Sequence, residues 1–376
     1  MPPLAALTEA AHAVLRPFGE ARSLPPSAYK DPTVFEHEQT HIFDCHWLCV
    51  GREEDVSRPG QWLRAPVTPE GVLIVRGTDL GLRAFYNVCR HRGSTLLDGP
   101  CGRAMSLRCP YHGWTYELSG ALCDAPHAPK DLDRAEHALS SVRVGVWQGF
   151  VFVALGEGAP SLKDVTHKAP SWLTESDLSH ARRVHQSEYT VTANWKLLVE
   201  NFQESDHFAR IHPALERLTP NAAARSVLGE GPWLGGTMTF ADGVETVSQS
   251  GRRLGRAFVA SPQYRRQVSD ALLFPALLTS LQPDYLLTYR LYPLSPERTT
   301  VVAETFFHPA SHPAEGDPAD IDDVVSFWNG VNEEDRSICE RQQIGVQSRG
   351  YRSSRYSLVE DGVHAFDSLV ARAYLS

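Results

Sequence analysis

The chain has 376 residues, 42% of them hydrophobic, so it is long enough for two domains with packed cores. The formal net charge is −9 and no long basic run is present, which argues against a nucleic acid as a partner. No apolar run is long enough for a transmembrane helix, and the N-terminus lacks the basic start and apolar core of a signal peptide. The seven cysteines are an odd number spread over a long chain, which indicates a reducing cytoplasm rather than a disulfide framework.

The first part of the chain is expected to be helical and then rich in strands. Residues 1–40 are expected to begin as a helical arm and then to become extended, because Pro25, Pro26 and Pro32 would break the helix. From residue 41 to residue 156, short apolar runs alternate with glycines, a pattern typical of short β-strands. Strands are expected there at residues 72–75, 82–88, 114–118, 142–147 and 150–155.

A second domain, residues 157–376, is expected to follow a junction at residues 156–160, which read GEGAP. Its strand runs are longer and are interleaved with a few long helices, which predicts an α+β domain. Strands are expected at residues 185–193, 235–240, 285–292 and 299–307, and helices at about 195–210, 262–273 and 320–347.

Two short pairs of cysteine and histidine stand out in the first domain. They are Cys89-Arg90-His91 and Cys109-Pro110-Tyr111-His112, and each pair offers one thiolate and one imidazole. This composition suits a [2Fe–2S] centre with two cysteines on one iron and two histidines on the other, whose reduction potential lies at roughly −150 to +300 mV. Nearby glycines permit tight loops close to a cofactor.

Two other interpretations of these four residues stay open. A single zinc ion accepts the same ligands. Free cysteine is also common as a small buried hydrophobic residue, so the four could be unrelated core residues. The remaining cysteines are expected to be packing or surface thiols, and they are Cys45, Cys49, Cys101, Cys123 and Cys339.

A second polar group lies in the segment NWKLLVENFQESDHFARIHP. His207 and His212 are five residues apart, which turns the face of a continuous helix by about 140° and keeps both from binding one ion. The residue before a proline is disfavoured in the α conformation, so Pro213 is expected to end the helix before His212. His207 would then lie in the last turn, with Glu204 on the same helical face.

The helix expected at 320–347 adds a carboxylate. Asp335 falls on a mostly apolar stripe, and a carboxylate directed into a core must be paired or bind a metal. With His207 and His212 it would form the 2-His-1-carboxylate set of non-haem Fe(II) oxygenases, which leaves positions open for dioxygen. Histidines at this spacing are also common as surface groups, and Asp335 also belongs to an acidic run that solvent could cover. The stripe consists of Val324, Trp328, Val331, Ile338 and Gln342.

With both groups in view, the chain resembles the Rieske non-haem iron oxygenases, the α subunits of ring-hydroxylating systems. The similarity covers roughly residues 24–366 and rests on SLPPSAY, CRHRG with CPYHGWTY, NWKLLVENF and EDRSICERQQIG; it is nearest in motif to the glycine betaine and carnitine monooxygenase branch. The resemblance implies an α+β fold. A Rieske β-sandwich domain at 41–156 would accompany a helix-grip catalytic domain with an antiparallel sheet at 157–376, to which the arm at 1–40 belongs.

The resemblance also assigns site residues. It implies a [2Fe–2S] Rieske cluster held by Cys89, His91, Cys109 and His112, and a mononuclear non-haem Fe(II) held by His207, His212 and Asp335. Glu204 matches a carboxylate that links a cluster histidine of one subunit to an iron-ligating histidine of its neighbour, and Asn201 matches an asparagine close to the iron. The branch usually has Cys-Tyr where this chain has Ser205-Asp206, so Asp206 is a second candidate for the bridge.

The implied function is that of a terminal oxygenase component, which activates O2 to oxidise a small organic substrate. Electrons would come from NAD(P)H through a separate reductase or ferredoxin, and the protein would be a homotrimer with electron transfer between neighbouring subunits. Monooxygenation, including demethylation, and aromatic ring hydroxylation by a dioxygenase both stay open. Two other classes also stay open, a Rieske-type electron carrier and a zinc-containing ligand-binding helix-grip protein. Candidates for a substrate pocket are Phe202, Phe208, Trp233, Phe240, Phe258, Tyr285, Tyr289 and Phe306.

Overall fold

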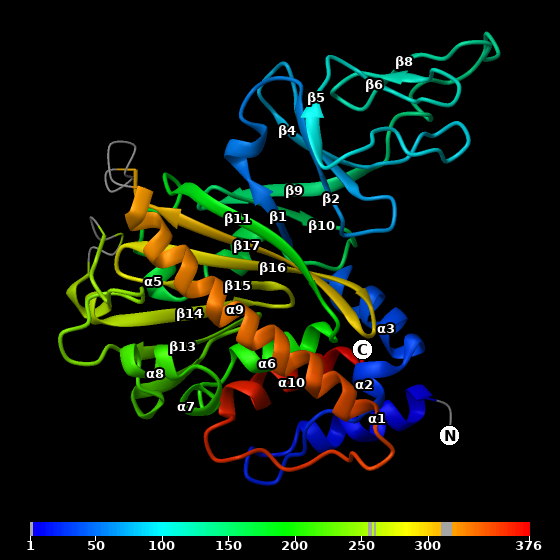
Figure 1. Ribbon diagram of the computed structural model, residues 1–376. Coiled ribbons are helices and arrows are strands. Elements are labelled where there is room, and N and C mark those ends of the chain that lie inside the picture. The colour runs from blue at the N-terminus through cyan, green and yellow to red at the C-terminus, as the bar shows by residue number, and fades with distance from the viewer. Residues whose placement is uncertain (1–2, 255–257, 259–260, 310–317) are drawn as a thin grey trace. The chain divides into compact units, whose positions relative to one another are not determined.

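The computed structural model describes residues 3–254, 258, 261–309 and 318–376. They form two compact units, one from Cys45 to Ala159 and the other from the N-terminal residues up to Asp44 together with Pro160 to Ser376. Antiparallel sheets form the framework of both units, and long helices occur in the second (Figure 1). This is the expected α+β combination. Among the described residues, no helix has both the length and the apolar character needed to cross a membrane.

The unit of residues 45–159 is built almost entirely from short strands. The larger sheet has the strand order β1-β10-β9-β4-β3-β2-β5, and the smaller one has the order β6-β7-β8. Central strands such as β3 are buried along their whole length, as expected of continuous apolar runs. The strands are β1 (Leu48–Arg52), β2 (Gln61–Ala65), β3 (Val72–Arg76), β4 (Leu82–Tyr86), β5 (Cys101–Arg103), β6 (Leu107–Arg108), β7 (Thr115–Tyr116), β8 (Leu122–Asp124), β9 (Ser141–Trp147) and β10 (Phe150–Ala154), and a 3-10 turn covers Glu53–Val56.

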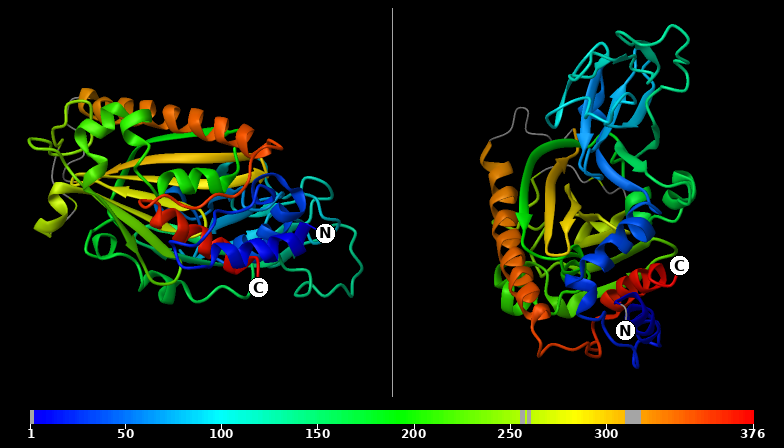
Figure 2. Two further views of the ribbon diagram at one scale, coloured as in Figure 1. Left: turned by 90° about the horizontal axis from the view of Figure 1, so that it is seen from below. Right: turned by 90° about the vertical axis from the view of Figure 1, so that its right-hand side faces the viewer.

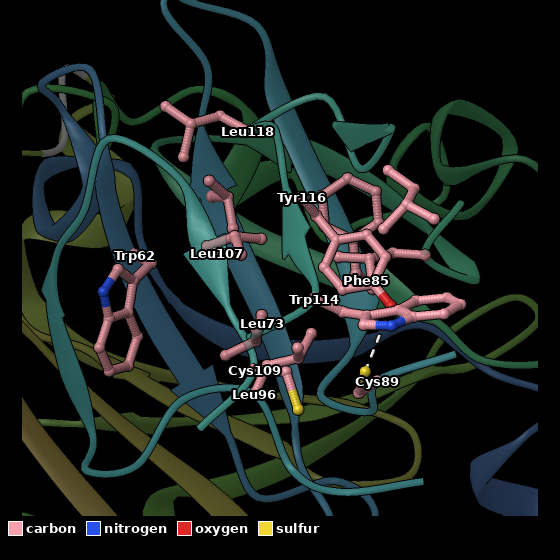
Figure 3. Packing of buried hydrophobic residues seen from close by; sticks show 13 residues of the cluster. Trp62, Leu73, Phe85, Cys89, Leu96, Leu107, Cys109, Trp114, Tyr116 and Leu118 are labelled. Atoms are coloured by element: carbon pink, nitrogen blue, oxygen red, sulfur yellow. Dashed lines mark hydrogen bonds between the residues drawn. The ribbon is translucent and has the colours of Figure 1, made fainter. Parts of the chain in front are cut away.

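A cluster of buried side chains fills the space between these two sheets. Leu73 and Phe85 of the larger sheet and Leu107 and Tyr116 of the smaller sheet belong to it (Figure 3). The cluster also contains two of the expected ligands, Cys89 and Cys109. The loops that carry the cysteines are therefore fixed to the core of the unit.

The second unit is built on a seven-stranded antiparallel sheet in the order β11-β17-β16-β15-β14-β13-β12. The helix α9 runs along one face of this sheet, and α6 lies beside α9 (Figures 1 and 2). The strands are β11 (Arg182–Val191), β12 (Ala224–Leu228), β13 (Trp233–Thr239), β14 (Gln267–Leu273), β15 (Leu277–Leu281), β16 (Tyr285–Ser295) and β17 (Arg298–Phe307). The helices are α1 (Pro3–Val14), α2 (Ser27–Lys30), α3 (Pro32–Glu38), α4 (Leu162–Thr166), α5 (Ser171–Thr174), α6 (Trp195–Phe202), α7 (Phe208–Ile211), α8 (Pro213–Leu218), α9 (Pro318–Gln347) and α10 (Asp361–Ala373), with a π-helical turn at Gln39–Phe43 and 3-10 turns at Asn221–Ala223 and Pro262–Arg266.

The helix expected at residues 262–273 is wrong. Pro262–Arg266 forms only a 3-10 turn, and the following residues form β14, which is hydrogen-bonded to β13 and β15. A short apolar run does not distinguish a buried strand from a buried helix by its periodicity. The pairing with both neighbouring strands decides for the strand.

The N-terminal segment differs from the expectation as well. Pro32 does not interrupt a helix but begins α3, where its missing N–H is not needed. The Asp31 side chain caps this helix by accepting a hydrogen bond from the Thr33 backbone N–H at 2.8 Å. The arm ends at Val14 and residues 15–26 contain no helix, as expected, but helical turns resume at Ser27 and reach Phe43.

Candidate metal centres

The first cysteine–histidine loop is a tight turn that follows β4. The Cys89 backbone N–H donates to the Ser94 carbonyl at 2.8 Å, and the Gly93 N–H donates back to the Cys89 carbonyl at 3.0 Å. Gly93 has a φ of 77°, a conformation that L side chains rarely adopt. The turn places Cys89 inside and the side chain of His91 outside.

The second loop, between β6 and β7, has the same construction. The Cys109 N–H donates to the Trp114 carbonyl at 2.8 Å, and the Gly113 N–H donates to the Cys109 carbonyl at 3.1 Å. Gly113 has a φ of 74°. Two unrelated stretches of sequence thus form equivalent turns, each with a buried thiol and an exposed imidazole.

The four side chains lie in two layers. Cys89 and Cys109 are buried, and both sulfurs lie at the same end of the cluster drawn in Figure 3. The rings of His91 and His112 lie above them at the surface, with centroids 4.8 Å apart. Two thiolates on the buried side and two imidazoles on the solvent side fit a [2Fe–2S] cluster with one histidine-ligated iron facing outward.

Two aromatic side chains that sequence analysis did not assign to the site support this arrangement. Tyr116 places its hydroxyl 3.3 Å from the Cys89 sulfur, the contact dashed in Figure 3. Trp114 stacks on the His91 ring at 4.7 Å between centroids. Burial raises the pKa of the Cys89 thiol, and the hydrogen bond with Tyr116 opposes that rise. Both aromatic residues belong to the CPYHGWTY motif, so this motif is the sequence signal that could have assigned them to the site.

The histidine pair of the second unit lies on an interrupted helix. The helix expected at 195–210 ends at Phe202, and the short helix α7 begins after a turn. His207 therefore stands at the start of α7 rather than in the last turn of a longer helix. His212 has φ −119° and ψ 61°, outside the α region, as Pro213 predicts. Non-helical backbone at His212 lets the two imidazoles converge.

Asp335 of α9 meets both histidines. Its Oδ1 lies 2.8 Å from His212 Nε2 and 3.7 Å from His207 Nε2. One ligand atom from each of the three residues lies within 4.8 Å of the others, an arrangement that could hold a metal ion. On α9 the buried stripe continues through Cys339 and Gln343, rather than through Ile338 and Gln342 as expected.

The electrostatics of the three groups are tightly linked. Burial raises the pKa of Asp335, but the hydrogen bonds to both histidines and to Asn201 outweigh it and lower the pKa to about 2. Burial lowers the pKa of His207, and its bonds to Asp335 and Glu204 raise the pKa to about 9 overall. A carboxylate that is ionised at neutral pH between two imidazoles is a suitable donor set for a divalent metal.

A carboxylate also holds the outer nitrogen of each imidazole. Glu204 Oε1 lies 2.5 Å from His207 Nδ1, and Glu334 Oε2 lies 2.7 Å from His212 Nδ1. These contacts fix both rings with Nε2 toward Asp335. Glu204 contacts His207 from the turn before α7. The expected proximity of these two residues is confirmed, but the prediction that they share one face of a helix is wrong. Sequence analysis missed Glu334 because its contact with His212 depends on how α9 packs.

The two remaining candidate residues differ in position. Asn201, at the end of α6, donates from Nδ2 to Asp335 Oδ1 at 2.7 Å and so orients this carboxylate. The Asp206 side chain is exposed, and only its backbone N–H contacts Glu204. The structure therefore brings Asn201 and Glu204 to the triad and leaves the carboxylate of Asp206 at the surface.

A cavity of about 620 Å³ opens beside the triad between α6, α9 and the sheet. Of the eight aromatic candidates, Phe202, Phe208 and Tyr289 line it. The remaining five, Trp233, Phe240, Phe258, Tyr285 and Phe306, are buried core side chains that do not line it. Three further lining aromatics were not expected, namely Phe18, Tyr189 and Trp328.

Two family models match the chain. The model of the Rieske [2Fe–2S] domain matches residues 46–144, which contain both cysteine–histidine loops. The model of the ring-hydroxylating α subunit, catalytic domain, matches residues 178–376, which is more than half of the chain and contains the triad. The match to a Rieske domain decides against the zinc interpretation of the cysteine–histidine loops.

Relatives over nearly the whole chain are oxygenase subunits. The glycine betaine monooxygenase oxygenase subunit of Chromohalobacter salexigens is 29% identical, with 94% of this chain and 86% of that protein covered. The carnitine monooxygenase oxygenase subunit of Acinetobacter pittii is 28% identical, with coverages of 94% and 95%.

Solved structures share the fold. The quaternary ammonium Rieske monooxygenase CntA superposes with a TM-score of 0.82 at 25% identity, with 97% of this chain and 98% of that chain covered. Naphthalene 1,2-dioxygenase of a Rhodococcus species gives a TM-score of 0.80 at 17% identity, with 99% and 98% covered. This chain belongs to the ring-hydroxylating α subunits, as the terminal oxygenase component of a Rieske system with a [2Fe–2S] cluster and a mononuclear non-haem iron as its cofactors.

Proposed function

We propose that this oxygenase mono-oxygenates a small methylated ammonium compound. The observation that carries the proposal is the cavity, because the triad, several aromatic side chains and the carboxyl group of Asp270 line the same space. Aromatic faces and carboxylates attract organic cations. The similar proteins named for glycine betaine, carnitine and choline monooxygenation support the same substrate class.

We further propose which residues hold the cofactors. The cluster would be held by Cys89, His91, Cys109 and His112, and the iron by His207, His212 and Asp335. Bound together, the two cofactors would supply electrons singly and an open metal position for O2 activation. The residues of the chain keep both imidazoles of the triad oriented and hold the substrate beside them.

The bridging role is best assigned to Glu204. Its carboxylate already holds His207 Nδ1, whereas the carboxylate of Asp206 has no hydrogen bond to the triad among the described residues.

Electron transfer from a neighbouring subunit would require a homotrimer, and a separate reductase or ferredoxin would supply NAD(P)H-derived electrons. A cytoplasmic location is proposed as well, because an odd number of cysteines spread over a long chain does not suit a disulfide framework.

The test is substrate-dependent O2 uptake by the purified, iron-loaded protein with a surrogate reductase. The panel contains methylated ammonium compounds and, as the alternative, bicyclic aromatic hydrocarbons. We expect coupled O2 uptake and an oxidised product with an ammonium compound, and neither with the His207→Ala variant. Coupled oxidation of the hydrocarbons alone would overturn the proposed substrate class.

A further inference from the structure

Asp270 lies in the sheet wall of the active-site cavity, on β14. Its neighbours across the sheet are Gly236 on β13 and Ser280 on β15, and both also line the cavity. A glycine on one side and a small serine on the other place little side-chain volume beside the carboxyl group at the cavity wall. Larger neighbours at either position would close over it.

One oxygen of this carboxyl group lacks a partner. Oδ1 lies beneath the cavity surface, with almost no accessible area, and it has no hydrogen-bond partner among the described residues. Burial raises the pKa of Asp270 to about 7, and the Ser280 hydroxyl only partly opposes this. A buried acceptor without a donor is costly, so a ligand whose donor meets the carboxyl group when it turns toward the cavity gains the benefit of the bond.

The surroundings favour a cation as that ligand. Tyr289 of β16 and Tyr189 of β11 line the same cavity, and so do Phe202 of α6 and Trp328 of α9. Aromatic faces attract an ammonium group, and an ionised carboxyl adds a charge-assisted hydrogen bond. A hydrogen bond requires an N–H, however, and a quaternary nitrogen has none.

We propose that Asp270 selects the substrate by accepting a hydrogen bond from the N–H of a protonated, N-methylated amine. The substrate class is therefore tertiary or secondary methylated amines rather than fully quaternary ammonium compounds. This inference rests on the proposed oxidation of methylated ammonium compounds and narrows it.

Two pairs of probes isolate the N–H. Choline and N,N-dimethylethanolamine differ only by one methyl group in place of the proton, and so do glycine betaine and N,N-dimethylglycine. Isothermal titration calorimetry on the iron-loaded protein gives the four affinities, and O2 uptake gives turnover. We expect the tertiary member of each pair to bind about tenfold or more tightly, as a hydrogen bond to a charged group provides.

The Asp270→Leu variant removes the acceptor at similar volume. Loss of the charge weakens the binding of both compounds in a pair, but only the tertiary amine also loses a hydrogen bond. The tenfold preference for the tertiary amine over the quaternary compound should therefore disappear. Asp284→Asn is the matched control, because Asp284 is buried, accepts bonds from Thr246 and the Leu254 N–H, and does not line the cavity. Its preference should equal that of the wild type.

The outcomes separate the two proposals. If none of the four compounds binds or stimulates O2 uptake, the proposed substrate class is wrong. If they bind but the quaternary members bind equally or more tightly in the wild type, the role of Asp270 is wrong while the class stands. This comparison needs only the wild-type protein, so it holds even if Asp270→Leu fails to fold. A folded Asp270→Leu protein with an unchanged preference would also overturn it.

Discussion

At the scale of single residues, the catalytic unit orients its imidazoles through their outer nitrogens. Glu204 and Glu334 each hold one Nδ1, so both Nε2 atoms meet at Asp335. This arrangement fixes the ring positions before any metal binds. The triad therefore depends on outer carboxylates that come from two distant parts of the chain.

Replacing any one residue of the triad by alanine should remove the mononuclear iron and preserve the cluster. His207→Ala, His212→Ala and Asp335→Ala each delete one of the three proposed protein ligands from an open site. Iron content should fall from about three to about two per chain, while the visible Rieske spectrum stays unchanged. A variant that keeps full iron and turnover would remove its residue from the ligand set.

Replacing Glu204 by glutamine should block turnover and leave both metals in place. The substitution keeps the size of the side chain but removes the charge that holds His207 Nδ1. We expect normal reduction of the cluster and a turnover lowered by about tenfold or more. Stopped-flow reoxidation of the reduced cluster, with substrate and O2 present, measures the blocked step.

Asp206→Asn is the control for this variant. This substitution removes the charge of a neighbouring carboxylate that lies at the surface. The turnover of the variant should therefore stay near that of the wild type. If Asp206→Asn shows the block and Glu204→Gln does not, the bridge belongs to Asp206.

The sequence predicts the triad and the cysteine–histidine loops because their spacing is local or their motif is specific. It does not predict Glu334 or Asp270. The first acts through the packing of α9 on α7, and the second lies on a strand that the apolar pattern presents as a helix. Both roles arise from tertiary contacts that no local pattern contains.

At the scale of elements, α6 connects the triad to a buried polar cluster. Its Asn201 faces Asp335, whereas its Glu200 accepts a hydrogen bond from Tyr29 at 2.8 Å. One turn earlier, Lys196 pairs with Glu38 of α3 at 2.5 Å, with both side chains fully buried. Such a pair is costly to break on one side only, so it holds α6 firmly in place.

The C-terminal helix α10 completes this cluster with Asp367. Tyr356 donates to its Oδ2 at 2.6 Å. Burial raises the pKa of Asp367 from 3.8 to about 7, although hydrogen bonds partly oppose the rise. Between about pH 4 and pH 7 the folded chain therefore holds a proton that the unfolded chain releases, and the free energy of unfolding falls as pH rises.

The Asp367→Asn variant should lose part of this pH dependence. Its amide cannot ionise but still accepts the Tyr356 bond, so its melting temperature should fall less between pH 5 and pH 8 than that of the wild type. Differential scanning calorimetry provides the comparison. Asp242→Asn, a substitution of a fully exposed residue, should keep the wild-type slope. Equal slopes for Asp367→Asn and the wild type would show that Asp367 is already ionised in the folded protein.

At the scale of the whole molecule, the two proposed metal centres belong to different compact units of one chain. The cluster loops lie within residues 45–159, and the triad lies within residues 160–376. An electron that moves from one centre to the other must therefore leave one unit for the other, either within a chain or between the subunits of the proposed homotrimer.

Mixed trimers of two inactive chains test this route. A His91→Ala chain lacks the cluster but keeps the iron, and a His207→Ala chain lacks the iron but keeps the cluster. Co-expression with different tags and tandem purification gives mixed trimers. In a closed ring of three, each subunit passes its electron to the next one. Whether a mixed trimer contains two chains of one kind or of the other, only one of its three steps leads from a chain with a cluster to a chain with iron. About one-third of wild-type turnover should therefore return. Purified mixed trimers without turnover would place electron transfer within a single chain.

The position of Glu204 gives this experiment a direction. Glu204 contacts His207, a proposed iron ligand, of its own chain, so it would act in the subunit that receives the electron. Adding Glu204→Gln to the His91→Ala chain should abolish the recovered turnover. Adding it to the His207→Ala chain should leave that turnover unchanged, because the iron of that chain is already absent. If both triple combinations behave alike, Glu204 does not connect the two centres, and its contact with His207 serves only to orient the ring.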